Sequence, residues 1–335
     1  MSVVTRPRPR GIAGRSAGWR IVAAKEFADH ISSARFYVLL LVLGLAAVVP
    51  LYFAADAIKS VASQVTDTRY AFVELFLYAP SNLPIPSVFA FVGIVAPLLG
   101  VAFSFDAINS ERTDGTLPRL LSQPIYRDDV VNGKFAAGLA IITVALLAVT
   151  GVIAGFGIVR LGIVPSSEEV IRLLAWLVIA IVWVSLWLAF GLLLSVVIRR
   201  ASTAALVGFG VWLLVAIFGQ LAIGLVAGVL APIFAAGASV PTLATQVFTD
   251  SIQRLLPLTL YLESARVILN PTETTVSVPS TIDQVAQYQQ QLQGQPIAFD
   301  QSLLLIWGHV VALVALTAIC FAAAYVKFMR QEVRA

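Results

Sequence analysis

Six apolar runs dominate the pattern of hydrophobic and polar positions along the chain. Each run reaches or approaches the ~20 residues needed to cross a hydrocarbon core about 30 Å thick. Backbone amides in lipid must be bonded within their own segment, so each run predicts a helix. The pattern therefore predicts an all-α polytopic membrane protein with six transmembrane helices. The runs cover residues 36–55, 87–105, 135–159, 173–198, 203–229 and 303–326.

The segment 17–35, before the first run, predicts an amphipathic helix in the membrane interface. Its apolar positions include Phe27 and Ile31, whereas Lys25, Glu26 and Asp29 face away, with Lys25 and Asp29 at i, i+4. An ordinary extension of the first span is the alternative. The basic tail 1–16 is expected to be disordered, and either to bind anionic lipid headgroups or simply to be solvated.

The distribution of Lys and Arg predicts the orientation. With the N-terminus inside, the inner segments 1–35, 105–134, 199–202 and 327–335 carry 16 of the 22 basic residues. An excess of Lys and Arg marks cytoplasmic segments. Both termini, including the tail 327–335, are therefore expected in the cytoplasm. The protein itself is expected to be a multi-pass protein of the cell membrane. The same rule accounts for the pI of about 9.4 without a nucleic-acid partner.

Three segments are then expected outside, at 56–86, 160–172 and 230–302. The last is a large loop that precedes the final span of the transmembrane domain, 36–326. Its pattern predicts helices near Leu243–Leu256, Leu258–Leu269 and Thr281–Gln293, after an apolar continuation at Leu230–Ala236 that could form a short re-entrant helix. Such a long excursion could close the outer mouth, meet an extracytoplasmic partner, or only cover the bundle.

The densest run of charge lies between the second and third spans, in the predicted cytoplasmic loop 105–134. Asp114-Gly115 indicates a turn, and Thr116 can then cap a short helix that Pro124 ends. Leu117, Leu120 and Leu121 would share one face of that helix. A leucine face held in water favours a soluble partner. A merely solvated loop is the alternative.

This loop resembles the first cytoplasmic loop of the type-2 (ABC-2) permease family of ATP-binding-cassette (ABC) transporters, as in type V exporters. In that family the loop holds a coupling helix that docks on a separate ATPase subunit. The segment Lys25, Glu26 and Phe27 is similar to the family's connecting helix. Pro118 and Tyr126 depart from the family pattern. The resemblance rests on Asp106, Ile108, Glu111-Arg112, Gly115-Thr116-Leu117, Leu120-Leu121-Ser122, Pro124-Ile125, Arg127 and Gly133-Lys134.

The resemblance implies a six-span half-transporter that pairs with a second permease subunit, as a homodimer or heterodimer. ATP and Mg would bind the partner ATP-binding subunit, and ATP hydrolysis would drive export or mechanical work. The residues expected to contact that subunit are Glu111, Gly115, Thr116, Leu117, Arg119, Leu120 and Leu121. The alternatives are a secondary, ion-coupled carrier and a non-transporting membrane scaffold.

Few other residues of the chain suggest a catalytic, metal-binding or transport role. The chain has no Walker A pattern and no hydrolase motif, so it is not expected to be an enzyme. One cysteine and two histidines predict no metal or cofactor site. Gln220 and His309 are the candidate pathway residues, and the scarcity of ionisable groups in the spans counts against a secondary carrier. Trp176, Trp183 and Trp187 recur along one face of the fourth span, which is predicted to face lipid.

Overall fold

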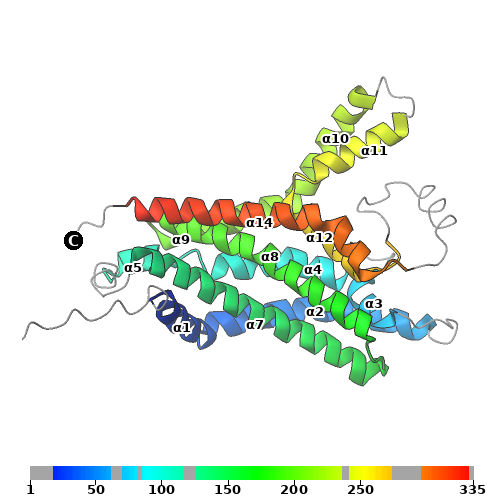
Figure 1. Ribbon diagram of the computed structural model, residues 1–335, viewed down its shortest axis with the longest axis horizontal. Coiled ribbons are helices and arrows are strands. Elements are labelled where there is room, and N and C mark those ends of the chain that lie inside the picture. The colour runs from blue at the N-terminus through cyan, green and yellow to red at the C-terminus, as the bar shows by residue number, and fades with distance from the viewer. Residues whose placement is uncertain are drawn as a thin grey trace, which may run out of the picture.

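The computed structural model describes residues 18–61, 70–80, 85–116, 126–235, 241–273 and 296–331, and the regular structure in these ranges is all helical. Long helices lie side by side along the longest axis (Figure 1). Five helices in the described ranges are long and apolar enough to cross a membrane. They are α2 (Ala34–Val61), α7 (Arg127–Leu161), α8 (Ser167–Val197), α14 (Phe299–Met329), and α9 (Ala201–Leu213) continued through a π-helical turn η1 (Leu214–Phe218) into α10 (Gly219–Ala235).

The second predicted span is shorter than the sequence suggested. It is α4 (Val88–Ala102), a 15-residue helix, which is about 22 Å long at 1.5 Å per residue. After Ala102 the chain turns, and the ring of Phe103 packs against His30 and Phe36, with centroids 5.1 and 6.4 Å away. The apolar residues after α4 therefore fill a contact with the N-terminal helices instead of extending the span. Within the described ranges, the structure thus gives five helices long enough to span a membrane and one short apolar helix.

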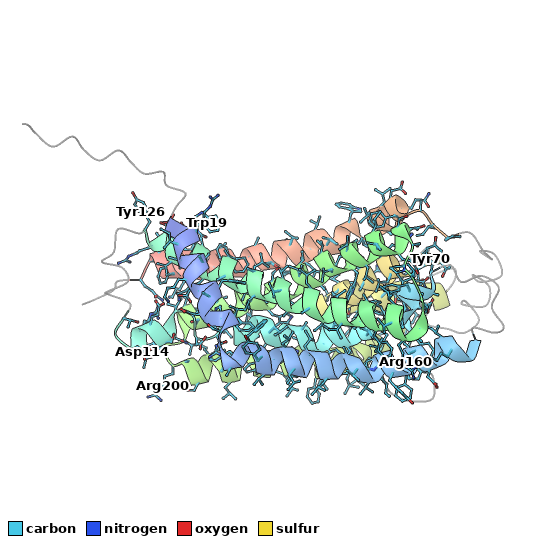
Figure 2. All side chains as sticks on the ribbon, turned by 90° about the horizontal axis from the view of Figure 1, so that it is seen from below. Trp19, Tyr70, Asp114, Tyr126, Arg160 and Arg200 are labelled. Carbon is cyan, nitrogen blue, oxygen red and sulfur yellow. The ribbon has the colours of Figure 1, made fainter. Side chains whose placement is uncertain are left out.

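The segments predicted to share one side of the membrane gather at one end of the bundle. Figure 2 shows Trp19, Asp114, Tyr126 and Arg200 together, with Tyr70 and Arg160 at the opposite end. We call these the α1 end and the α3 end, after the short helices that lie there. These are α1 (Gly18–Ile31) and α3 (Ala71–Leu77).

The predicted loop 230–302 is partly built into the bundle. Helix α10 runs on to Ala235 with Pro232 inside it, so a separate short helix from Leu230 is not formed. Helix α11 (Pro241–Gln253) returns beside α10, and this pair projects from the bundle (Figure 1). The next helix, α12 (Pro257–Leu269), packs against α4, α8 and α14 and is mostly buried. The predicted helix Thr281–Gln293 lies outside the described residues.

The tryptophans of α8 face the core, so the lipid-facing prediction was wrong. Trp176 and Trp183 are each 1% exposed. The Trp183 indole N–H donates to the backbone oxygen of Gly93 at 2.8 Å, and that of Trp176 donates to the hydroxyl of Tyr261 in α12 at 3.2 Å. A buried indole needs a hydrogen-bond acceptor, which lipid tails do not offer. Trp176 therefore ties α8 to α12, and Trp183 ties α8 to α4.

At the α3 end, a fully buried arginine joins three elements. Arg172 in the first turns of α8 donates through Nε to Glu168 at 3.0 Å. Its guanidinium also donates to the backbone oxygens of Ile268 and Ile297, at 3.1 and 2.7 Å, and to the hydroxyl of Ser302 at 3.1 Å. A buried charge is stable only when it is paired and its donors are satisfied. Arg172 thereby ties α8 to the end of α12 and the start of α14.

Candidate functional site

The cytoplasmic loop predicted at 105–134 is anchored at the α1 end by α8. After α4 the chain enters α5 (Asn109–Thr113), a five-residue helix. The backbone N–H groups of Ile108 and Asn109 donate to the buried hydroxyl of Ser195 in α8, at 2.8 and 3.2 Å. Gly115 follows with a φ of +68°, which confirms the predicted turn, because glycine adopts this left-handed conformation without strain.

A buried lysine connects this loop to the N-terminal helix. The Nζ atom of Lys134 in α7 lies 2.7 Å from Oε1 of Glu111 in α5 and 3.0 Å from Oε1 of Glu26 in α1. The Lys134 side chain is only 5% exposed. Its charge is therefore desolvated and relies on the two carboxylates. Three elements that are separate in the chain meet at one ammonium group.

The close approach of α1 to α7 has a local cause. A Cβ atom at Gly133 would meet Val22 at 2.6 Å and the backbone oxygen of Trp19 at 2.8 Å, so only glycine fits there. Four residues earlier, the buried carboxylate of Asp129 accepts the N–H of Trp19 at 3.1 Å and that of Tyr126 at 3.2 Å. One carboxylate thus caps the starts of both α1 and α7. Helix α1 is held on α7 by shape and by hydrogen bonds.

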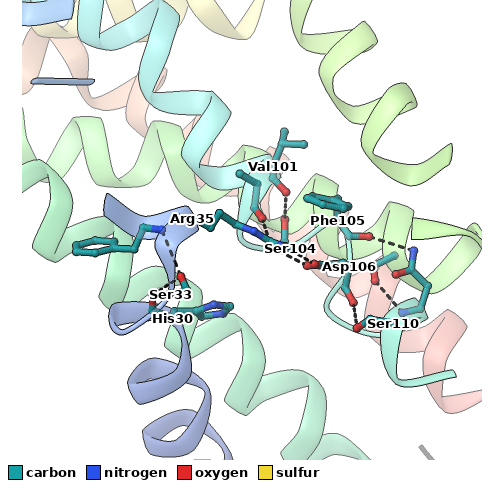
Figure 3. Close-up of polar contacts among 12 residues, drawn as sticks. His30, Ser33, Arg35, Val101, Ser104, Phe105, Asp106 and Ser110 are labelled. Carbon is teal, nitrogen blue, oxygen red and sulfur yellow. Dashed lines mark hydrogen bonds and ion pairs between the residues drawn. The ribbon is translucent and has the colours of Figure 1, made fainter. Parts of the chain in front are cut away.

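A second ion pair joins α2 to the turn after α4. Figure 3 shows Arg35, at the start of α2, reaching Asp106. The two guanidinium nitrogens lie 3.1 and 2.7 Å from the two carboxylate oxygens, and one of them also donates to the backbone oxygen of Ala102 at 2.9 Å. Such a two-pronged contact fixes orientation as well as distance. The starts of α2 and of the loop are therefore held in one geometry.

The end of α14 completes the arrangement. The Gln331 side chain donates to the backbone oxygen of Val196 in α8 at 3.0 Å and contacts Arg112 of α5. Arg112 also donates to Val196, at 3.2 Å, and Arg127 donates to the Gln331 backbone oxygen at 2.9 Å. The loop is thus attached to the last span as well as to the first three long helices.

The charged side chains at the α1 end shift the pKa of Glu26. Burial by itself would raise the pKa of the Glu26 carboxyl, but the ammonium groups of Lys134 and Lys25 outweigh that effect and hold its pKa below the ordinary value. Lys25 forms the predicted i, i+4 ion pair with Asp29 at 2.9 Å on the exposed side of α1. Glu26 was predicted to face away with them, but it turns toward α7. The ion pair with Lys134 of α7 explains that difference, and the pattern of α1 alone does not reveal it.

Comparison with known proteins decides the family. The family model described as ABC-2 family transporter protein matches residues 20–333. The chain belongs to this family. A stretch of 136 residues of this ABC-2 protein is also 31% identical to the probable ABC transporter permease protein NosY of Stutzerimonas stutzeri. That stretch is 39% of this chain and 47% of the relative, so the match spans about half of that permease.

The coupling residues predicted for this ABC-2 protein are only partly described. Leu117, Arg119, Leu120 and Leu121 lie outside the described residues. Glu111 contacts Lys134, and the Thr116 hydroxyl donates back to the Glu111 backbone oxygen at 3.3 Å. Phe27 of α1 packs, partly buried, against the main core.

Neither Gln220 nor His309 lies at the α1 end of the ABC-2 protein, but both contact α12. The Gln220 amide donates to the Thr259 hydroxyl at 2.9 Å, and Nε2 of His309 lies 2.7 Å from the Glu263 carboxylate. Arg254 also contacts Glu263, at 3.0 Å. The expectation of few ionisable groups among the spans therefore changes, because Glu263 of α12 contacts His309, and Arg254, which precedes α12, contacts Glu263.

Two residues that position the site were missed from the sequence. From the sequence, Arg35 contributed only to the count of basic residues that predicts the orientation. Gln331 was not predicted to have a role. An arginine at the start of a span is a weak signal by itself, since topology alone explains it. Among the described residues, no group of three His, Cys, Asp or Glu side chains is placed to hold a metal ion.

Proposed function

We propose that this protein is the transmembrane permease subunit of an ABC transporter. It couples ATP hydrolysis by a separate ATP-binding subunit to export of a substrate or to mechanical work across the cell membrane. ATP and Mg²⁺ bind that partner, and two permease subunits, identical or different, pair in the membrane. Membership of the ABC-2 family and the similarity to a probable ABC permease support this assignment.

The observation that carries the proposal is the junction at Lys134. Glu111 lies shortly before the segment 117–121, which the resemblance assigns to docking on the ATP-binding subunit. A displacement of that segment pulls on Glu111, and the 2.7 Å contact passes the displacement to α7. Glu26 passes it on to α1, which leads directly into α2. Desolvated, hydrogen-bonded charges resist separation far better than exposed ones, so the junction moves as a unit.

The pair of Arg35 and Asp106 adds a parallel connection. It links the start of α2 to the turn that follows α4. Three membrane helices, α2, α4 and α7, are thereby attached to the same loop. In this mechanism a movement of the ATP-binding subunit tilts them together, and the transport path opens or closes between them and their counterparts in the second permease subunit.

The partner assignment is tested by co-purification. We expect the affinity-tagged permease to retain an ABC ATP-binding subunit when the two are co-expressed, and vesicles holding the complex to hydrolyse ATP. The permease alone should hydrolyse none, because it lacks a Walker A pattern. An ABC ATPase encoded beside the permease is the first partner to try. Failure to retain any such subunit would contradict the proposal.

The orientation is tested with single cysteines in a Cys320→Ala background. Asp114→Cys lies at the α1 end, whereas Val164→Cys follows Arg160 of the α3 end by four residues. The native Val164 is 77% exposed. In intact cells an impermeant thiol reagent should label position 164 and not position 114, because the charge count places the α1 end inside. Permeabilised cells should label both positions. Labelling of position 114 from outside would reverse the topology and remove the coupling role of the loop.

A further inference from the structure

Helices α2 and α7 enclose an apolar groove between them. The two helices run in the same direction, from the α1 end to the α3 end, and lie against each other (Figure 1). The groove has a volume of about 140 Å³, and the residues that line it are apolar. They lie between Leu40 and Leu51 of α2 and between Ala148 and Ile153 of α7. An apolar cavity of about 150 Å³ can take up benzene, so this groove has room for part of a hydrocarbon chain.

The groove opens toward the surroundings of the bundle. Val48 of α2 and Val152 of α7 line it and are 53% and 68% exposed. Both valines lie in helices that are long and apolar enough to cross a membrane. The surroundings at that position are therefore the acyl chains of lipids, and a water-soluble ligand has no access from that side.

Gly44 of α2 keeps the groove open. A Cβ atom at Gly44 would meet no other atom of the described chain within 4 Å, whereas a Cβ atom at Gly133 would clash with α1. Glycine is a poorer helix former than alanine, so a glycine in the middle of α2 needs a reason. Close packing between helices of this chain does not supply that reason. Space for a group from outside the chain does.

Each of the two helices carries an exposed cation beyond the groove. Lys59 follows Leu51 of α2 by eight residues, and Arg160 follows Val152 of α7 by eight residues. Figure 2 shows Arg160 at the α3 end. Eight residues correspond to about 12 Å of helix, which is less than the ~15 Å half-thickness of the hydrocarbon core. When the two cations lie at the headgroups, the groove therefore lies within the hydrocarbon of the same leaflet.

Neither topology nor ion pairing explains these two cations. The predicted orientation places the α3 end outside, where the charge rule does not favour Lys and Arg. Of the other basic residues predicted outside, Arg172, Arg254 and Arg266 pair with carboxylates. Within the described parts of the chain, no carboxylate lies within 4.0 Å of the charged groups of Lys59 and Arg160. Both are thus available to an anion from the membrane.

We propose that the groove between α2 and α7 binds an acyl chain of an anionic phospholipid, whose headgroup contacts Lys59 and Arg160. The groove contributes apolar burial, which is similar for all phospholipids, and the cations select an anionic headgroup. The long side chains of lysine and arginine follow an apolar surface and keep their charges at the headgroups. Asp56, which is also exposed on α2, opposes an anion, but the two cations outnumber it.

A lipid in this groove contacts two helices that the loop at the α1 end also connects. Its binding favours the arrangement in which α2 and α7 lie against each other, because only that arrangement forms the groove. The site does not rest on the proposed function. It is testable on the permease alone, and its failure would leave the coupling proposal untouched.

The test measures which lipid occupies the groove, by fluorescence quenching in vesicles. A bimane fluorophore is attached at Leu45→Cys in the Cys320→Ala background, because Leu45 is 59% exposed next to Gly44 and is not among the lining residues. Phosphatidylcholine vesicles receive a rising fraction of phosphatidylglycerol that is brominated in the middle of its chains. Half-maximal quenching should need an about fivefold lower fraction of this lipid than of equally brominated phosphatidylcholine, because the site carries one net positive charge.

Variants separate the groove from a general attraction to charge. Gly44→Leu fills the groove and should abolish the preference for phosphatidylglycerol. The matched control is Gly151→Leu, which adds the same volume at a position of α7 that is also open but does not line the groove, and it should keep the preference. Lys59→Gln and Arg160→Gln should each remove the preference. Asp56→Asn should raise it about fivefold further.

Three results would overturn the proposal. One is the same half-maximal fraction for both lipids in the protein that carries only the fluorophore. Another is a preference that survives in Gly44→Leu. The third is disulfide formation between two copies through Leu45→Cys without quenching by either lipid, since a second copy would then cover the groove. Gly44→Leu should fold, because leucine favours a helix more than glycine does, and thermal unfolding checks this.

Discussion

Replacing Leu117 and Leu120 with aspartate should release the ATP-binding subunit from the permease. Each buried leucine stabilises a docking surface by roughly 1.5–3 kcal/mol. Losing two should therefore weaken binding by about two to four factors of ten. The charges at Glu111 and Arg119 would add orientation more than affinity, because charges at the rim of an interface are screened.

Pull-down of the ATP-binding subunit, with ATP-driven transport measured in the same vesicles, checks this result. The matched control is Ser122→Asp, which adds a charge to the same segment on the side predicted to face away from the leucines. The spans should insert normally in both variants, because the segment is predicted to lie outside the hydrocarbon. Undiminished binding and transport in the double variant would mean that the segment is only a solvated loop.

Replacing Lys134 with methionine should disrupt the junction between α1, α5 and α7. The substitution leaves the carboxylates of Glu26 and Glu111 facing each other without their shared cation. Removing one partner of a buried ion pair costs about 3–5 kcal/mol. We expect a marked loss of thermal stability and at least a tenfold loss of transport per ATP hydrolysed. The control is Arg20→Met, since Arg20 is exposed on α1 and lies 5.5 Å from the centre of the Trp19 ring.

A compensated variant distinguishes coupling from stability. Lys134→Met combined with Glu26→Met and Glu111→Met removes all three charges, and replacing a whole buried ion cluster by apolar residues of similar volume is often neutral or stabilising. Thermal unfolding in detergent should return close to that of the original protein. Transport per ATP should stay low, because neutral side chains hold the three helices less firmly. Full recovery of transport would show that Lys134 serves stability alone.

Much of the fold was accessible from the sequence because lipid leaves few options. Apolar length predicted where α2, α7, α8 and α14 lie, since an uninterrupted helix satisfies the backbone in lipid, although the helices extend up to eight residues beyond the predicted spans. Helices α11 and α12 were also predicted, with their prolines near the starts. The end of α4 was placed too late, because Phe103 and Phe105 are apolar for a different reason. They pack against neighbouring residues at the α1 end.

The candidate site was only partly predictable because its contacts join distant segments. Gly133 and Lys134 were recognised as parts of a family pattern, but nothing local indicates that Lys134 turns toward Glu26 of α1. Similarly, Glu263 was assigned to an outer loop, because the predicted orientation placed the whole segment 230–302 outside. Its burial follows from Tyr261 filling the space beside Trp176 and Trp183. Hydrogen-bonding partners on other helices of the bundle determine whether such a side chain is buried. The periodicity of one helix does not reveal those partners.

The buried Arg172 has a consequence for the order in which the protein is assembled. Most of its acceptors are supplied late, since Ile268, Ile297 and Ser302 follow it by 96, 125 and 130 residues. Chains are synthesised from the N-terminus, so α8 is in place well before these groups emerge. Until then Glu168 is the acceptor at hand, and the other N–H groups of this guanidinium lack their hydrogen-bond acceptors. The start of α8, at the α3 end, therefore matures only when the start of α14 arrives, which makes the last long helix the closing step in biogenesis.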